Sequence, residues 1–287
     1  MIFKELMTEP NQSYDPMFNS LDDNCVVLVS SDGIHYRIHS SILRIASGFF
    51  HAMITLPQVS DRPDSVTLEE KSNVVGILLR MISGLEVAKW ESYEVIEDVL
   101  EAANKYDMPG PIAVMRLMIT SPQFLEDPLR LFVVATRFGW AEEAKLASRL
   151  TLTLAIYDEE HETILGRLSS RYLLKLLKLH QRRKDGFKGL IDNQDKFNAG
   201  NTDPHLCCGG VKDNVFWRSL KSAMAAEMNR RPKGDTLLGA QFEEWPEAEA
   251  CWAARCKTCS VVFYDKATTM ENIKDCLESL PDSIDWK

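Results

Sequence analysis

Apolar and polar positions along the chain predict a small sheet near the N-terminus and helices over most of the remainder. Residues 25–29 (CVVLV) form an apolar run, and residues 34–38 (IHYRI) alternate between apolar and polar. The Ser-Ser-Asp-Gly segment between them contains the residues that a tight turn favours, so the two runs predict a β-hairpin. A further short strand is predicted at 66–68 (VTL).

Apolar residues at helical spacing predict helices elsewhere. Ser40 or Ser41 is placed to cap a helix, Gly48 interrupts it, and Phe49 and Phe50 continue on a second short helix. The same spacing predicts further helices at about 74–82, 93–106, 111–118, 127–138, 140–155, 159–166, 169–190, 214–230 and 269–279.

Polar stretches divide these elements into segments. We predict a flexible leader at 1–21, an α+β domain at 22–120, an α-helical extension at 121–190, a polar linker at 191–204 and a small C-terminal α/β domain at 205–287. Within the last domain, residues 232–249 are rich in Pro, Gly and acidic residues and predict a loop. The expected fold class is therefore α+β, with a small sheet and helices followed by mainly helical segments.

The N-terminal part resembles a BTB/POZ domain. The segment IHSSILRIASGFFHAM follows the predicted hairpin, and VLEAANKYDM closes a later helix. The matching residues are Asp32, Gly33, His39, Leu43, Ser47, Phe49, Phe50, Ala102, Ala103, Tyr106 and Met108. The resemblance covers most of 24–120 and implies a non-enzymatic protein–protein interaction module. We expect His39 to cap the junction between hairpin and helix, and the Phe pair to fill the core.

The longer chain resembles the BTB-containing proteins that fungi, basidiomycetes especially, carry in many copies. Residues 56–58 (LPQ), 137–148 (RFGWAEEAKLAS) and 179–184 (LHQRRK) are part of this resemblance. In these proteins the C-terminal part has paired Cys-x-x-Cys elements around a Trp-containing helix. Here Cys256 and Cys259 form the second pair, and His205 stands where the first pair usually has a cysteine.

Two departures bear on the partners that the resemblance implies. Many BTB dimers use an acidic residue at the start of the first hairpin strand and a basic residue just after the histidine, but Cys25 and Ser40 occupy those places here. These departures disfavour a dimer of that particular kind and leave open a homodimer formed by other contacts. No hydrophobic-x-acidic signature of cullin-3 recruitment follows the Phe-Phe helix, so a cullin-type ligase is a partner that the family allows rather than one that the motif indicates.

Charge and composition narrow the function classes. The 287 residues have a formal net charge of −9, which disfavours binding to phosphate backbones. The N-terminal residues MIFKELMTEPNQSYDP lack the apolar core of a signal peptide, and no apolar run is long enough to cross a membrane. We therefore expect an intracellular, cytoplasmic or nuclear protein that does not bind membranes, and the charge makes nucleic acid an unfavoured partner.

Cysteine spacing indicates a metal site in the C-terminal domain. Five of the seven cysteines lie between 207 and 259, and in a reducing compartment such crowding favours zinc over disulfides. Cys256 and Cys259 have the two-residue spacing of a zinc-binding turn, and His205 and Cys208 repeat it. We predict a structural zinc with these four ligands; Cys207 can replace either member of the first pair. The alternatives are buried thiols without metal and, least favoured, redox cysteines.

The motifs of common enzyme classes do not occur in the sequence. We find no nucleophile elbow, phosphate-binding loop or dinucleotide fingerprint, so no catalytic or cofactor-binding residue is predicted. The basic run Arg182-Arg183-Lys184 is interpreted as a solvated helix face rather than a phosphate-binding patch. The leading hypothesis is an interaction protein, with ligase adaptor as one form. A transcription-linked protein whose zinc region contacts nucleic acid is the alternative, and an unrecognised metal-dependent enzyme ranks third.

Overall fold

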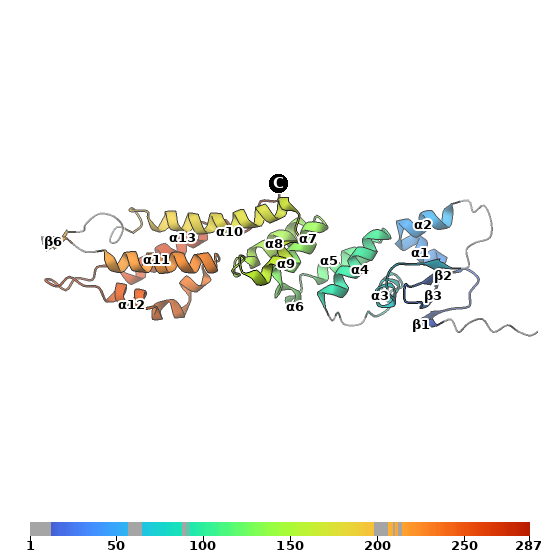
Figure 1. The fold of residues 1–287 in the computed structure, drawn as a ribbon. Coiled ribbons are helices and arrows are strands. Elements are labelled where there is room, and N and C mark those ends of the chain that lie inside the picture. The colour runs from blue at the N-terminus through green and yellow to red at the C-terminus, as the bar shows by residue number, and fades with distance from the viewer. Residues whose placement is uncertain are drawn as a thin grey trace, which may run out of the picture. The chain divides into compact units, whose positions relative to one another are not determined.

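The computed structural model describes residues 13–56, 65–87, 90, 92–197, 206–208, 210–211 and 214–287. The chain divides into two compact units, Met1–Phe124 (unit 1) and Leu125–Lys287 (unit 2). Figure 1 shows the elements of both, and each unit is described by itself below.

A four-stranded sheet forms one side of unit 1, in the order β1-β3-β2-β4. Strands β2 (Cys25–Val29) and β3 (His35–His39) pair in antiparallel fashion and confirm the predicted hairpin. Gly33 in its turn has φ +86°, a conformation that L side chains rarely adopt. The short β4 (Val66–Thr67) pairs in parallel with β2.

The predicted leader is wrong for residues 14–19, which form the edge strand β1 (Tyr14–Asn19), parallel to β3. The contacts that hold this strand come from residues of β3, so they cannot be recognised from residues 14–19 alone. The Arg37 guanidinium lies over the Tyr14 ring, 4.4 Å from its centroid, and donates a hydrogen bond to the Tyr14 hydroxyl. Phe18 is buried against Tyr36 of β3. Residues 1–12 of the predicted leader lie outside the described residues.

Helices pack on this sheet and extend unit 1. They are α1 (Ser40–Ala46), α2 (Gly48–Thr55), α3 (Ser72–Ile82), α4 (Tyr93–Lys105), α5 (Pro109–Met118) and, at the boundary, α6 (Pro122–Leu125). Most of these agree with the predicted helices to within a few residues. The core includes Leu28, Tyr36, Ile38, Leu43, Phe50, Val75, Leu79, Val99 and Leu100.

His39 and the Phe pair test two specific expectations for unit 1. The Nδ1 atom of His39 accepts a hydrogen bond from the Ser41 backbone N–H, so His39 caps α1, as the resemblance implied. The cap expected from the helical pattern, Ser40 or Ser41, is wrong, because both residues lie within the helix. Phe50 is fully buried, but Phe49 is 45% exposed, so only one ring of the pair fills the core. Both rings contact Tyr106, with centroids 5.4 Å away in each case.

Unit 2 is built almost entirely of helices. Its elements are α7 (Pro128–Arg137), α8 (Ala141–Thr151), η1 (Glu159–His161), α9 (Glu162–Leu165), α10 (Ser170–Ile191), β5 (Leu206–Cys207), β6 (Gly210–Val211), α11 (Val215–Arg230), η2 (Asp235–Leu238), η3 (Ala240–Glu244), α12 (Pro246–Ala253) and α13 (Lys266–Glu278). Among the described residues, no helix combines the length and the apolar character needed to cross a bilayer.

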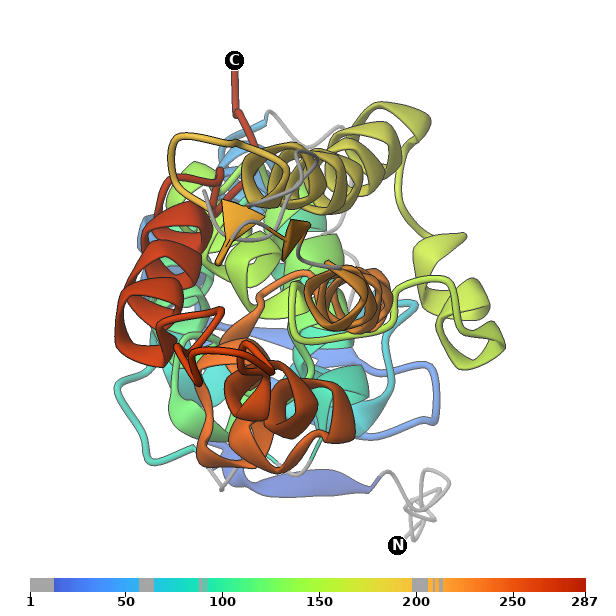
Figure 2. The same ribbon diagram turned by 90° about the vertical axis from the view of Figure 1, so that its left-hand side faces the viewer.

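The C-terminal part of unit 2 has one helical core. Figure 2 views α11 nearly along its axis, and α10 and α12 pack against it. The buried face of α11 consists of Trp217, Leu220, Met224 and Met228. Val215 and Phe216, which the helical spacing places on this face, are 46% and 40% exposed. The predicted loop at 232–249 is also wrong in part, because η2, η3 and the first turn of α12 lie within it.

Arg183 on α10 corrects the prediction of a solvated basic face. Its side chain is 4% exposed, and its guanidinium donates hydrogen bonds of 2.6–3.5 Å to five backbone carbonyl oxygens. The acceptors are Pro232, Lys233, Leu277, Leu280 and Pro281. Because carbonyls at helix C-termini lack partners within the helix, one guanidinium here ties the ends of α11 and α13 to α10.

Candidate metal centre

Cys256 and Cys259 lie on a tight loop that follows α12. The loop is closed by a backbone bridge between Arg255 and Val262. Within it, the Cys256 N–H donates to the Val261 carbonyl, and the Ser260 N–H donates back to the Cys256 carbonyl, both at 2.9 Å. Ser260 has φ +59°, so the chain reverses directly after the second cysteine. Both thiols are thereby presented on one side of a fixed turn.

Cys208 lies on a second tight turn, between β5 and β6. These two-residue strands pair in antiparallel fashion, with Cys207 opposite Gly210. Cys208 has φ +53°, in the left-handed region that costs free energy for a residue with a side chain. Backbone strain of this kind is often found at functional sites, so the conformation of Cys208 supports a functional role for this turn.

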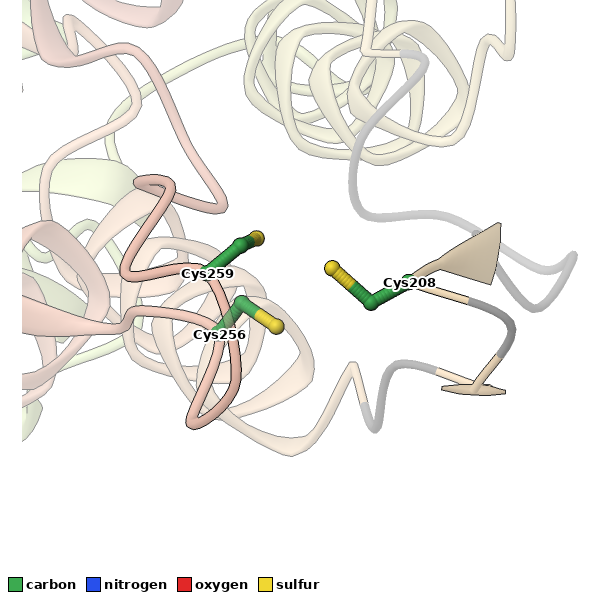
Figure 3. A group of neighbouring side chains, drawn as sticks. All are labelled: Cys208, Cys256 and Cys259. Atoms are coloured by element: carbon green, nitrogen blue, oxygen red, sulfur yellow. The ribbon is translucent and has the colours of Figure 1, made fainter.

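The three sulfur atoms of Cys208, Cys256 and Cys259 lie within 4.8 Å of one another. Figure 3 shows the three side chains directed toward a common point from the two turns. In a tetrahedral zinc site with Zn–S bonds of about 2.3 Å, the sulfurs lie about 3.8 Å apart. The observed cluster is therefore close to the dimensions of such a site. Cys256 is largely buried, whereas Cys208 and Cys259 are exposed.

Three of the four predicted ligands are thus brought together from positions far apart in the sequence. The fourth, His205, lies outside the described residues, as do residues 198–204 of the predicted linker. The backbone of Cys207 is part of β5, but its side chain is outside the described atoms. The choice between His205 and Cys207 for the fourth position stays open.

The cysteines outside the cluster have a different environment. Cys251 and Cys276 are fully buried in the helical core of unit 2, and burial raises the pKa of both thiols, that of Cys251 to about 12. A buried thiol with a raised pKa stays protonated at neutral pH and is a poor metal ligand. Cys25 is half-buried on β2.

The donor set fits a soft divalent cation. Zinc prefers thiolate and imidazole ligands in a tetrahedron, and pairs spaced as Cys256 and Cys259 can bind from one turn. With a fourth ligand from the chain, every coordination position would be filled, so the metal would stabilise structure rather than bind substrate. It would pin the β5–β6 turn to the loop after α12.

In unit 1, the residues that carry the BTB resemblance hold elements together. Both carboxylate oxygens of Asp32 accept hydrogen bonds from Ser72, one from its N–H at 2.8 Å and one from its hydroxyl at 2.6 Å. Hydrogen bonding by the hydroxyls of Ser30 and Ser72 contributes most to lowering the pKa of Asp32, which falls to about 2. Asp32 thereby ties the hairpin turn to the first turn of α3.

Ser47 and Tyr106 form the second set of contacts. The Ser47 hydroxyl donates to the Tyr106 carbonyl at 2.5 Å and accepts from the Phe50 N–H at 3.0 Å, which caps α2 and attaches it to the end of α4. The Tyr106 hydroxyl in turn donates to the carboxylate of Glu70. Burial and this carboxylate raise the pKa of Tyr106. These residues of the sequence motif therefore hold the elements of unit 1 together.

Comparison with known families agrees with this architecture. Residues 17–122 match the family model of the BTB/POZ domain, so this part of the chain is a BTB/POZ domain, a class of protein–protein interaction module. Its small mixed sheet and helices give the α+β class that the sequence predicted. A search of curated proteins found no match to the chain.

Proposed function

We propose that this protein is a non-enzymatic interaction protein that associates with itself or recruits a protein partner through its BTB domain, with a structural zinc in unit 2. The match of residues 17–122 to an interaction family carries this proposal. The four-ligand set His205, Cys208, Cys256 and Cys259 and the fungal origin suggested by the sequence remain predictions, as does an intracellular location.

Exposed apolar side chains on the first helices support an interaction surface. Ile45 on α1 is 87% exposed and Phe49 on α2 is 45% exposed. Leu56, which caps α2, is 64% exposed. Large apolar side chains that gather on a short helical segment are typical of a contact surface for another protein. The charged pair of many BTB dimers is absent here, since Cys25 and Ser40 occupy its places, so apolar contacts are the better candidates.

The first experiment measures the mass of the full chain by light scattering over a range of concentrations. Self-association gives a mass above the 32.6 kDa of one chain, and Ile45→Asp should shift the protein toward that value. Leu174→Asp on α10 is the matched control, because Leu174 is also an exposed aliphatic residue, 54% exposed, in the other unit. A single-chain mass for the parent at all concentrations would contradict self-association.

The ligase-adaptor form needs its own test. Purified full-length chain is mixed with the N-terminal region of a cullin-type ligase scaffold, and complex formation is followed by calorimetry. Binding that Ile45→Asp or Phe49→Asp weakens, while Leu174→Asp does not, supports the adaptor form. Absence of saturable heat, together with a single-chain mass in the first experiment, would remove both forms of the proposal.

A further inference from the structure

Residues 279–287 follow α13 and lie along α10; we call this segment the strap. The Ile284 N–H donates to the Ser148 hydroxyl at 3.1 Å, and the Trp286 ring stacks on Tyr172 with centroids 5.2 Å apart. Lys175 donates from its Nζ atom to the carbonyls of Asp285 and Lys287. Figure 1 marks this end of the chain beside the first turns of α10. The strap is therefore held at several points along its length.

A pocket of about 200 Å³ lies between this strap and α10. Its lining includes Lys175, Lys178, Leu179 and Arg182 from the helix and Pro281 and Ile284 from the strap. Leu179 and Ile284 are buried and form an apolar floor. Pockets for drug-sized ligands and cofactors are typically about 300–1,000 Å³, so this one fits a single side chain or a small group.

The cations at this pocket have no counterion in the described part of the chain. Lys178 and Arg182 are exposed and four positions apart on one helix face, and within the described residues neither forms a hydrogen bond or an ion pair. Asp185, one turn beyond Arg182, instead accepts from the Gln181 amide at 2.8 Å. Like charges at this spacing repel each other and destabilise a helix, so an external anion would relieve the repulsion.

The acidic groups of the strap are already engaged. Asp282 accepts from the Ser283 hydroxyl at 3.0 Å and pairs with Arg149 at 2.8 Å. Asp285, which lines the pocket, accepts from the Lys287 N–H at 3.1 Å. Neither carboxylate neutralises Lys178 or Arg182. The described lining of the pocket therefore has four basic side chains, Lys175, Lys178, Arg182 and Lys287, against the single acidic side chain of Asp285, in a chain whose formal net charge is −9.

We propose that this pocket binds a phosphorylated side chain of a partner protein, with Lys178 and Arg182 on the phosphate and the apolar floor under its carbon atoms. A phosphate monoester carries about −1.5 to −2 charges at neutral pH, which matches two cations better than a single carboxylate does. The planar guanidinium of Arg182 can donate two parallel hydrogen bonds to phosphate oxygens, and Lys178 adds a point charge. The site lies in unit 2 and does not depend on the BTB surface.

A peptide is favoured over a membrane or a free anion by the shape and size of the site. The charge is gathered at one recess that also contains Asp285, rather than spread over a basic face that an anionic bilayer would need. The floor formed by Leu179 and Ile284 gives free inorganic phosphate nothing to contact, whereas a phosphorylated side chain has carbon atoms to bury there.

The test is calorimetric titration of the full chain with a blocked pentapeptide that has phosphoserine at its centre and glycine and alanine elsewhere. The same peptide with serine, and inorganic phosphate alone, are titrated in parallel. We expect saturable binding of the phosphopeptide only, weakened about tenfold or more in Lys178→Ala/Arg182→Ala. Arg44→Ala/Lys188→Ala removes the same charge from exposed positions outside the pocket and should bind as the parent does.

Several outcomes would overturn the proposal. One is phosphopeptide binding no tighter than that of inorganic phosphate, which would define a free-anion site. Another is equal weakening in both double variants, which would indicate a diffuse charge effect. Absence of binding, or retention by phosphatidylinositol phosphate vesicles that the phosphopeptide does not displace, would also contradict it. Circular dichroism shows that each variant is folded, and the charge-reversed Lys178→Glu/Arg182→Glu should abolish binding. None of these outcomes affects the BTB-based proposal.

Discussion

The Cα atom of Gly48 lies so close to Asp107 that a Cβ atom added there would come within 1.9 Å of the Asp107 Oδ2 atom. The two residues are also joined by their backbones, because the Gly48 N–H donates to the Asp107 carbonyl at 2.9 Å. Asp107 is itself in the left-handed region, with φ +49°. The start of α2 and the end of α4 therefore meet so closely that a side chain at position 48 requires the Asp107 side chain to move.

Gly48→Ala should lower the free energy of unfolding of unit 1 by about 0.5–1.5 kcal/mol, because the added methyl group must displace the Asp107 side chain from its position. Calorimetric unfolding of the full chain measures this change. Gly110→Ala is the matched control, since nothing lies within 4 Å of a Cβ atom at Gly110 in α5, and it should be neutral or stabilising. Asp107→Gly added to Gly48→Ala should restore most of the loss, and failure to do so would contradict the steric explanation.

Arg183→Met should lower the free energy of unfolding of unit 2 by about 2–4 kcal/mol, because five carbonyl oxygens then lose their donor in a buried place. Five of the six tryptophans lie in unit 2, so denaturation followed by tryptophan emission reports mainly on it. Arg182→Met changes the neighbouring, exposed arginine and should cost less than about 0.5 kcal/mol. Equal losses for the two variants would show that the carbonyl contacts of Arg183 contribute little.

Elements with local signals were predictable, and elements held by distant contacts were not. The hairpin, α1 and α2 follow from the Asp-Gly turn and from serine and histidine caps that act within a few residues. Strand β1 escaped prediction because its stability comes from pairing with β3 and from Arg37. α12 was missed because its short segment has little apolar periodicity and begins at Pro246.

The candidate metal site was predicted as two pairs of ligands that bind one metal, but the packing that brings the two pairs together could not be read from the sequence. The spacing of Cys256 and Cys259 is a local signal, whereas the approach of Cys208 depends on the packing of α11 and α12, 47 residues of intervening chain (209–255). The contrast between buried Arg183 and exposed Arg182 could not be read from the sequence either. It depends on a strap about a hundred residues later in the chain.

Acid should destabilise unit 2 through His180, which is fully buried on α10. Burial and the nearby charges of Lys184 and Arg183 lower its pKa from 6.5 to about 4. Its Nε2 atom lies 3.1 Å from the Thr151 hydroxyl, which already donates to the Ser148 carbonyl, so Nε2 carries the proton. The Nδ1 atom has no hydrogen-bond partner within the described structure, so protonation would add a buried, unsatisfied donor.

The sign of the effect follows from these two pKa values. Between pH 6.5 and about 4 the unfolded chain binds the proton while the folded chain does not, so the stability of unit 2 falls as the pH falls through this window and levels off below it. His180→Leu should remove up to about one proton from the pH slope of the unfolding free energy in this window. Denaturant titrations at several pH values measure it, and equal slopes in parent and variant would contradict the role of His180.

Metal content separates the cysteine cluster from the other cysteines. Elemental analysis of the purified chain should give about one zinc per chain, and Cys256→Ser, Cys259→Ser and Cys208→Ser should each lose it, because the sulfurs of all three converge. Cys25→Ser, in the other unit, should keep it. The cluster variants should also unfold more readily in unit 2. A parent without metal, and cluster variants as stable as the parent, would leave three neighbouring thiols with no structural role for zinc.

The fourth ligand can be identified by comparing two single variants at neighbouring positions. If His205 completes the site, His205→Ala should lower zinc affinity and leave a site with only the three cysteine ligands, while Cys207→Ser should bind zinc as the parent does. The opposite pattern would assign Cys207. Substitution of zinc by cobalt gives an independent readout, because its visible spectrum distinguishes three thiolates with one imidazole from four thiolates. If both variants bound metal as the parent does, and the spectrum showed a coordinated water, the site would have an open position, and a purely structural role for the metal would be wrong.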